Sequence, residues 1–231
     1  LSMWDSQVPV LTDLGFRVLR YDSRGHGKSG APNTPYTIEM LTEDVVGLLA
    51  ALDLDTVHFC GLSMGGMVGR CFAFKYPDRL NSLILCATAA YLNAPGVWDE
   101  RRALVEKKGM ASVMEPTLER WFTANANDTI PEALQQVREG ILQTPPQGYV
   151  KSCIAIRDMA LREAIKSIHL PTLIIAGEKD PSTTVEAARE IAKAIDSAEL
   201  AVIPGAQHLL NIEMAEAFNR LLTQFLLNNS K

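Results

Sequence analysis

Several features that mark specialised proteins are scarce in this chain of 231 residues. It has no surplus of basic side chains, since 27 Asp and Glu outnumber 22 Lys and Arg and give a formal net charge of −5. We therefore expect no general phosphate-binding face for nucleic acid. No apolar run approaches the roughly 18 residues needed to span a bilayer, and no signal peptide is visible, so we expect no membrane association.

Cysteine is scarce as well. The sequence scatters its four cysteines through apolar stretches without the spacing of metal ligands: Cys60, Cys71, Cys86 and Cys153. We interpret them as reduced core residues, which predicts a cytoplasmic protein without a metal site. The chain as a whole has 47% hydrophobic and 21% charged residues, a composition typical of a globular domain with a large core.

Predicted strands and helices alternate along most of the chain. Buried strands are expected at residues 16–22, 56–60, 80–89, 171–177 and 199–205, and helices at residues 5–14, 36–54, 64–77, 183–195 and 211–227. Strands joined by helices need crossover connections, which predicts an α/β fold with a mostly parallel sheet and helices on both faces. Only helical patterns appear in between, so we predict a helical cap (91–168) inserted into a core domain (1–90 and 169–231).

A serine lies between a predicted strand and a predicted helix in the stretch "VHFCGLSMGGMVG", residues 57–69. The order strand, G-x-S-x-G, helix describes a tight turn that lifts the hydroxyl of Ser63 above the edge of a sheet. Gly61 and Gly65 would leave room where the two backbones nearly touch. The N–H of Met64, at the start of the helix, would stabilise a developing oxyanion. The alternative is that Ser63 merely caps the helix.

Chain order identifies a base for such a serine, because an acid and then a histidine follow the nucleophile in this architecture. Only His208, in "PGAQHLLN", comes after a late strand. Of the other histidines, His26 is interpreted as a structural residue of a loop and His58 as a core residue of a strand. His169 lies just before a predicted strand. We therefore predict His208 as the catalytic base.

The acid is expected at the carboxyl end of the preceding strand, where the active sites of parallel sheets open. The stretch "PTLIIAGEKDPSTT" offers Glu178 and Asp180 at this place. Thr183 and Glu186 have the spacing of a capping box for the next helix, so Asp180 is not needed as the helix cap and can act as the acid. Glu178 is then a loop charge, and the serine, Asp180 and the late histidine are predicted to form a catalytic triad.

Four segments, "YDSRGHGKS", "GLSMGGMVG", "AGEKDP" and "GAQHLLNIE", together resemble the α/β-hydrolase superfamily over nearly the whole chain. Within it, "LSMWDSQVPVL", "LRYDSRGHGKS" and "ERWFT" are similar to 3-oxoadipate enol-lactonases. The resemblance implies an α/β-hydrolase fold in which Ser63, Asp180 and His208 take the nucleophile, acid and base positions. It also implies hydrolysis of 3-oxoadipate enol-lactone to 3-oxoadipate in aromatic-compound catabolism, without a metal or organic cofactor.

A lactone that carries a free carboxylate would be bound best by a cation. Arg157 lies among apolar neighbours in "SCIAIRDMAL" on a predicted cap helix, where its guanidinium would bind a carboxylate bidentately. The alternative, which we rank higher, is a structural ion pair within the cap. Trp121 in "ERWFT" is a second candidate for the substrate pocket, and a place in the cap core is an equal alternative. Arg24 is expected to brace its own loop.

Fold and triad do not name the substrate, so other functions stay open. The same elbow serves general carboxylesterases and cofactor-free haloperoxidase-like perhydrolases. A non-catalytic, ligand-binding hydrolase fold ranks below these because all three triad residues are present. The expected partner is in each case a small molecule.

The first residues, "LSMWD", resemble the stretch just after the family's oxyanion loop. The resemblance therefore implies that the first strands of the fold, and the second oxyanion donor, are missing before Leu1. The absent strand next to the central one would lie between the predicted strands 16–22 and 56–60. About 25 further residues would supply three short strands and their turns. We expect the printed chain to leave unpaired backbone beside the central strand.

Overall fold

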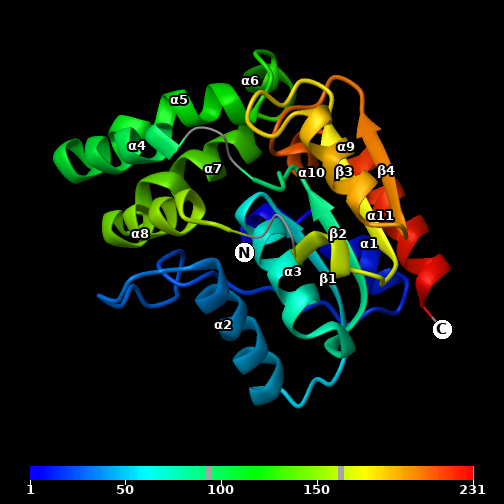
Figure 1. Ribbon diagram of the computed structural model, residues 1–231. Helices are drawn as coiled ribbons and strands as arrows, with labels where there is room; N and C mark the ends of the chain where they lie inside the picture. The colour runs from blue at the N-terminus through cyan, green and yellow to red at the C-terminus, as the bar shows by residue number, and fades with distance from the viewer. Residues whose placement is uncertain (92–94, 161–163, 231) are drawn as a thin grey trace.

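The computed structural model describes residues 1–91, 95–160 and 164–230. Within them, parallel strands form one sheet in the order β1-β2-β3-β4 (Figure 1). The strands are β1 (Val57–Leu62), β2 (Leu80–Cys86), β3 (Thr172–Gly177) and β4 (Ala198–Ile203). Because neighbouring strands run in the same direction, each connection crosses over through helices.

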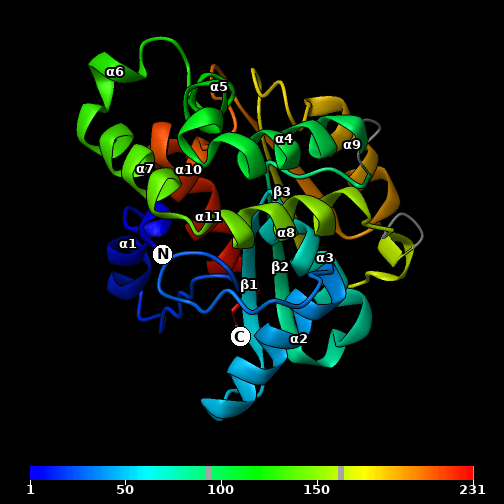
Figure 2. The ribbon, with the colours of Figure 1, turned by 90° about the vertical axis from the view of Figure 1, so that its left-hand side faces the viewer.

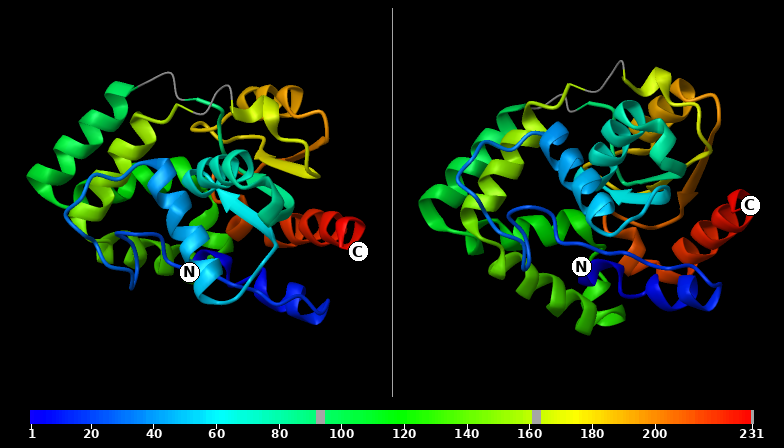
Figure 3. Two further views of the ribbon diagram at one scale, coloured as in Figure 1. Left: turned by 60° about the horizontal axis from the view of Figure 1, so that its bottom comes forward. Right: turned by 90° about the horizontal axis from the view of Figure 1, so that it is seen from below.

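Helices cover both faces of the sheet, as the sequence predicts. One face carries α3 (Met64–Lys75) and α9 (Val185–Ala194), with α2 (Ile38–Ala51) packed against α3. The other face carries α11 (Ala215–Asn229), and α1 (Val8–Asp13) lies beside it (Figures 2 and 3). Short helical turns complete this part: η1 (Ser2–Trp4), η2 (Pro77–Arg79), η3 (Ala164–Ser167) and α10 (Leu210–Glu213).

The sheet separates two apolar clusters, because the side chains of a strand point alternately to its two faces. In β2, Leu83 and Leu85 belong to the cluster formed with α2, α3 and α9. Ile84 and Cys86 belong to the cluster formed with α11 and with helices that follow β2. All four side chains are fully buried, so the middle of the sheet is a rigid support for the loops at its ends.

The chain between β2 and β3 is helical, as predicted. We call its helices the insertion helices: α4 (Pro95–Lys108), α5 (Ala111–Trp121), α6 (Ala126–Thr129), α7 (Pro131–Gln143) and α8 (Pro146–Arg157). They lie together on one side of the molecule, with α4 packed along α8 (Figures 1 and 2). Residues 92–94 and 161–163 of the expected cap lie outside the described residues.

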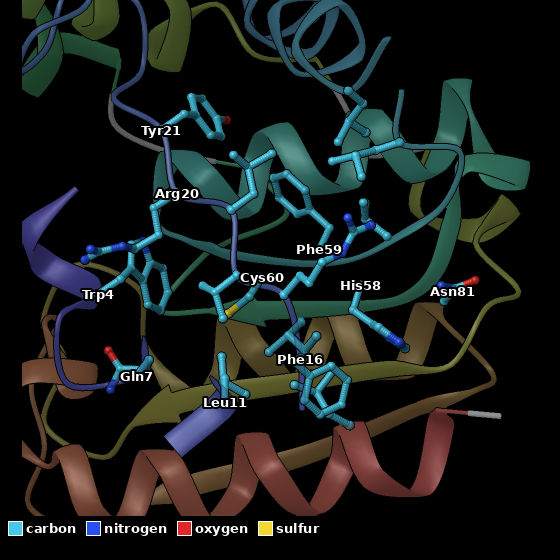
Figure 4. Close-up of a pocket in the computed structure, with 18 of the residues that line it drawn as sticks. Trp4, Gln7, Leu11, Phe16, Arg20, Tyr21, His58, Phe59, Cys60 and Asn81 are labelled. Atoms are coloured by element: carbon cyan, nitrogen blue, oxygen red, sulfur yellow. The ribbon is translucent and has the colours of Figure 1, made fainter. Parts of the chain in front are cut away.

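The prediction of a strand at residues 16–22 is wrong, because the structure has irregular backbone there. This segment is separated from β1 by a groove of about 580 Å³, lined mainly by apolar side chains (Figure 4). Phe16 and His58 both line it, and their rings meet edge to face with centroids 6.0 Å apart and planes at 88°. A strand needs the N–H and C=O groups of a neighbour, and β1 pairs only with β2 in the described residues. The sheet therefore ends at the outer edge of β1.

The other predicted strands and helices are present, with ends that differ by a few residues. Residues 211–227, predicted as one helix, form α10 and α11 with a break at Met214. Nowhere in the described chain is a helix both long and apolar enough to span a bilayer.

Candidate active site

Ser63 occupies the turn between β1 and α3. Its φ of 54° and ψ of −113° lie where a residue with a side chain is held only under strain. The turn is fixed by two hydrogen bonds: the Ser63 amide donates to the Cys86 carbonyl (2.9 Å), and Thr88 Oγ1 donates to the Ser63 carbonyl (3.0 Å). The Ser63 side chain makes no capping hydrogen bond to α3, which disfavours a role as a helix cap. Met64 begins α3, so its N–H has no carbonyl partner within the helix.

Glycines make this turn possible, but only one of the two predicted glycines is at a crowded position. A Cβ on Gly61 would lie 2.2 Å from the carbonyl oxygen of Gly65, so strand and helix touch there. The prediction is wrong for Gly65 itself, because a Cβ at that position would meet nothing within 4 Å. The second crowded position is Gly66, where a Cβ would lie 2.8 Å from the side chain of Thr88.

Asp180 and His208 lie in the loops that follow β3 and β4. His208 Nδ1 is 2.7 Å from Asp180 Oδ2, and both residues are only 4% exposed. The loops come this close because Gly177 has no side chain: a Cβ there would lie 2.4 Å from the carbonyl oxygen of Gln207. The structure thus brings together the two residues that chain order selects as acid and base.

Asp180 accepts further hydrogen bonds from the Ser182 amide (2.7 Å), the Thr183 amide (3.1 Å) and Thr183 Oγ1 (2.5 Å). Burial by itself would raise the pKa of Asp180, but the hydrogen bonds, with that of His208 first, hold this pKa below its ordinary value. The carboxylate is therefore ionised at neutral pH. Because it occupies Nδ1 of His208, Nε2 is the ring nitrogen left to exchange a proton.

Among the described residues, no hydrogen bond joins Ser63 to His208. Such catalytic contacts often tighten only in the complex with substrate. The two residues nevertheless lie on loops at the same edge of the sheet, since β1 and β4 are parallel and both loops follow the carboxyl ends of their strands.

Thr183 contributes to the site in a way that its sequence context did not predict. The N-cap of α9 is Thr184, whose side chain accepts a hydrogen bond from the Ala187 amide (3.3 Å). The predicted capping box is therefore wrong by one residue. Thr183 instead donates to Asp180, and its Oγ1 lies 3.4 Å from His208 Nδ1. Two adjacent threonines before the helix gave no local signal that distinguishes these roles.

The two residues predicted to contact substrate have definite surroundings. Trp121 stacks on His208, with ring centroids 6.3 Å apart and planes 26° apart. Arg157 donates to Asp158 (2.7 and 2.8 Å) and to Asp99 (2.6 Å). These hydrogen bonds, those from Asp158 first, raise the pKa of Arg157. The geometry of Arg157 favours the structural ion pair, and a contact with substrate stays a prediction.

The residues expected to be structural are found with structural partners. His58 Nδ1 is 2.7 Å from Ser82 Oγ on the neighbouring strand. His26 Nδ1 is 3.2 Å from the Arg24 carbonyl oxygen. The Arg24 side chain donates to both carboxylate oxygens of Asp44 on α2, which ties its loop to that helix.

Three further observations concern the surroundings of the candidate site. No group of three or more His, Cys, Asp or Glu in the described part of the chain is arranged to hold a metal ion. Glu178, the other acid considered, accepts a hydrogen bond from the Gly205 amide (2.8 Å) and so braces a loop. The groove beside β1 is a separate feature, since it is not lined by Ser63, Asp180 or His208.

Comparison with known proteins agrees with this geometry. Residues 1–215 match the family described as alpha/beta hydrolase fold. 3-Oxoadipate enol-lactonase 2 of Acinetobacter baylyi is 36% identical over 95% of this chain and 81% of its own length. The crystal structure of the enol-lactonase from Burkholderia xenovorans has a TM-score of 0.95 and 42% identity, over 98% of this chain and 86% of that one. A bromoperoxidase from Bacillus anthracis has a TM-score of 0.90 and 27% identity, over 97% and 87%.

Proposed function

Because this chain belongs to the α/β-hydrolase fold family, we propose that it hydrolyses a small carboxylic ester or lactone, with 3-oxoadipate enol-lactone as its substrate. The observation that carries the proposal is the buried pair of Asp180 and His208 beside a strained serine turn. The enol-lactone is supported by the identity with two named enol-lactonases over most of the chain. We place the reaction in the cytoplasm, where the free thiols stay reduced.

The reaction begins when His208 Nε2 removes the proton of Ser63 and Ser63 Oγ attacks the lactone carbonyl. Asp180 holds the imidazole in the required tautomer and stabilises the imidazolium. The Met64 N–H at the start of α3 donates to the oxyanion. The C–O bond of the ring then breaks, and His208 returns the proton to the leaving enol oxygen, so the opened chain stays attached as an ester of Ser63. Water activated by His208 hydrolyses this ester and releases 3-oxoadipate.

A substrate panel tests this proposal. Purified protein is assayed with 3-oxoadipate enol-lactone, with 4-nitrophenyl acetate, and for peroxide-dependent halogenation. We expect kcat/KM to be highest for the enol-lactone, and a burst of 4-nitrophenolate equal to the enzyme concentration if deacylation is slow. Turnover of the aryl ester without turnover of the lactone would support a general carboxylesterase. Activity that requires peroxide would support a perhydrolase, the function suggested by the similarity to a bromoperoxidase.

The insertion helices are proposed to form the cap over this site, with residues 91–168 as the cap and residues 1–90 and 169–231 as the core. The similarity of the relatives covers both parts. Light scattering would measure the oligomeric state, and a crystal of Ser63→Ala soaked with the enol-lactone would identify the residues that contact substrate.

A further inference from the structure

The carboxyl end of α5 is closed by the loop that carries His208. The last four carbonyl groups of a helix accept no hydrogen bond from an N–H group inside the helix, so they need donors from elsewhere. One of them, that of Leu118, accepts from the Phe122 amide (3.0 Å). The other three accept from the loop after β4: Glu119 and Arg120 from Gln207 Nε2 (3.1 Å each), and Trp121 from the Leu209 amide (3.0 Å).

A carboxylate adds a further connection just beyond the helix. Thr123 donates to Glu213 Oε1 through its amide (2.9 Å) and through its hydroxyl. Glu213 belongs to α10, which follows the same loop. The contacts of Gln207 and Leu209 lie directly before and after His208 in the sequence. Any displacement of the end of α5 would therefore be transmitted to the backbone on both sides of His208.

Trp121, the last residue of α5, connects this end of the helix to the imidazole itself. Its ring lies nearly parallel to that of His208, at 26°, with the centroids 6.3 Å apart. His208 is 4% exposed, so little space is left for another ring orientation. Asp180 fixes Nδ1 from a different loop. The hydrogen bond sets the position of one ring atom, and the indole limits how far the ring plane tilts about it.

We propose that Trp121 is a positioning residue for His208, and that α5 and the loop of residues 207–213 form one unit that aims the base at Ser63. The insertion then does more than cover the substrate, because it supplies a part of the support of the catalytic base. This inference rests on the proposed function only in taking His208 as the base. It differs from the prediction that Trp121 lines the pocket, which concerns substrate binding.

The two roles of Trp121 predict different kinetics. A pocket residue contributes binding energy, so its loss raises KM with little effect on kcat. A positioning residue holds a reacting group, and misplacement by about 1 Å costs on the order of 10²-fold in rate. The difference is clearest with 4-nitrophenyl acetate, whose small acyl group makes few contacts with a cap.

We therefore expect Trp121→Leu to lower kcat for 4-nitrophenyl acetate by about 10- to 100-fold with little change in KM. Trp121→Phe retains a flat ring and should keep most of the activity. Gln207→Ala removes the side-chain donor to α5 and should lower kcat in the same direction by less. The matched control is Trp98→Leu, because Trp98 lies on α4 and stacks with Arg101 (5.1 Å). Circular dichroism would establish that each variant is folded.

Two kinetic results and one spectroscopic result would overturn the inference. An increase in KM for Trp121→Leu with unchanged kcat would assign Trp121 to the substrate pocket, and equal effects of Trp121→Leu and Trp98→Leu would reduce its role to general packing. The stacking itself is tested without turnover, in a Trp4→Phe, Trp98→Phe background that leaves Trp121 as the single tryptophan, excited selectively over tyrosine. Its emission should change with His208→Ala, and unchanged emission would refute the contact. Loss of lactone turnover alone would count against the proposed substrate, not against this role of Trp121.

Discussion

Gly61 and Gly65 flank Ser63 symmetrically in the sequence, yet their surroundings differ. We expect Gly61→Ala to destabilise the protein by about 1–3 kcal/mol or more, because the added Cβ would lie 2.2 Å from a carbonyl oxygen. Gly65→Ala places its Cβ in open space on a helix and is expected to change stability by less than about 1 kcal/mol. Urea denaturation of the two variants measures the difference. Equal destabilisation would contradict the close contact between β1 and α3.

The triad residues are predicted to act as one unit. Ser63→Ala, His208→Ala and Asp180→Asn should each abolish most turnover and leave the fold intact. The double variant Ser63→Ala with His208→Ala should be little slower than either single variant, because neither residue works without the other. Steady-state kinetics on one substrate is sufficient for this comparison. Losses that multiply in the double variant would show that the two residues act independently.

At the scale of the helices and strands, Arg70 on α3 forms hydrogen bonds with the segments that follow β2 and α8. Its guanidinium is fully buried and donates to the carbonyls of Ala89 (2.6 Å) and Ala90 (3.2 Å) and to the sulfur of Met159 (3.5 Å). Burial lowers the pKa of Arg70 to about 10. Ala89 and Ala90 follow β2, and Met159 follows α8, so one side chain connects α3 to both ends of the insertion.

We expect Arg70→Met to lower the free energy of unfolding by about 1–3 kcal/mol, because it leaves two buried carbonyl groups without donors. Arg70→Lys keeps the charge but cannot reproduce the fork of donors, so it should also be destabilising. Chemical denaturation measures both variants. A Met variant as stable as the parent would show that burying the guanidinium costs as much as its hydrogen bonds contribute.

The ion pair of Arg157 connects α8 to Asp99 on α4. Its side chains are 25% and 44% exposed, so solvent screens the pair and its contribution to stability is expected to be small. We expect Arg157→Leu to reduce kcat/KM for the enol-lactone and for 4-nitrophenyl acetate by the same small factor. A much larger loss on the enol-lactone alone would instead assign Arg157 to the substrate carboxylate, the role that ranked below the ion pair on the sequence.

For the whole molecule, the open edge of β1 has consequences in solution. Unpaired strand edges next to apolar surface favour pairing between molecules. Leu19 lines the groove there and is 44% exposed. We expect Leu19→Lys to reduce concentration-dependent association measured by light scattering. Leu142→Lys is the matched control, since Leu142 is 47% exposed on α7 and does not line the groove. Equal effects of both variants would show that self-association does not depend on this edge.

The pH dependence of stability follows from two partly buried histidines, His26 and His58. Burial lowers the pKa of His26 below its ordinary value of 6.5 in the folded chain. The unfolded chain then binds the proton more readily, so stability is lost as pH falls through about 6.5. Burial also lowers the pKa of His58, which acts in the same direction. We expect His26→Gln to make the decline in unfolding free energy between about pH 7 and 5 shallower. An unchanged slope would exclude this contribution of His26.

The sequence by itself determined the features that depend on local pattern and on chain order. Hydrophobic periodicity predicted the helices and most strands, because side chains repeat at different intervals in the two structures. The spacing around Ser63 predicted the strained turn, and the order of strands predicted that Asp180 and His208 would meet. These inferences succeed because parallel strands bring their carboxyl ends to one edge, whatever the loops contain.

Only the tertiary structure decided the features that depend on a partner far away in the sequence. Residues 16–22 have the pattern of a strand, but the described part of the chain offers them no neighbouring strand to pair with. Thr183 contacts Asp180 instead of capping a helix, and Arg157 pairs with Asp99 on α4, a distant partner that the sequence did not identify. The stacking of Trp121 on His208 joins two segments 87 residues apart. The local sequence pattern does not predict such contacts, because they form only when the packed elements bring the side chains together.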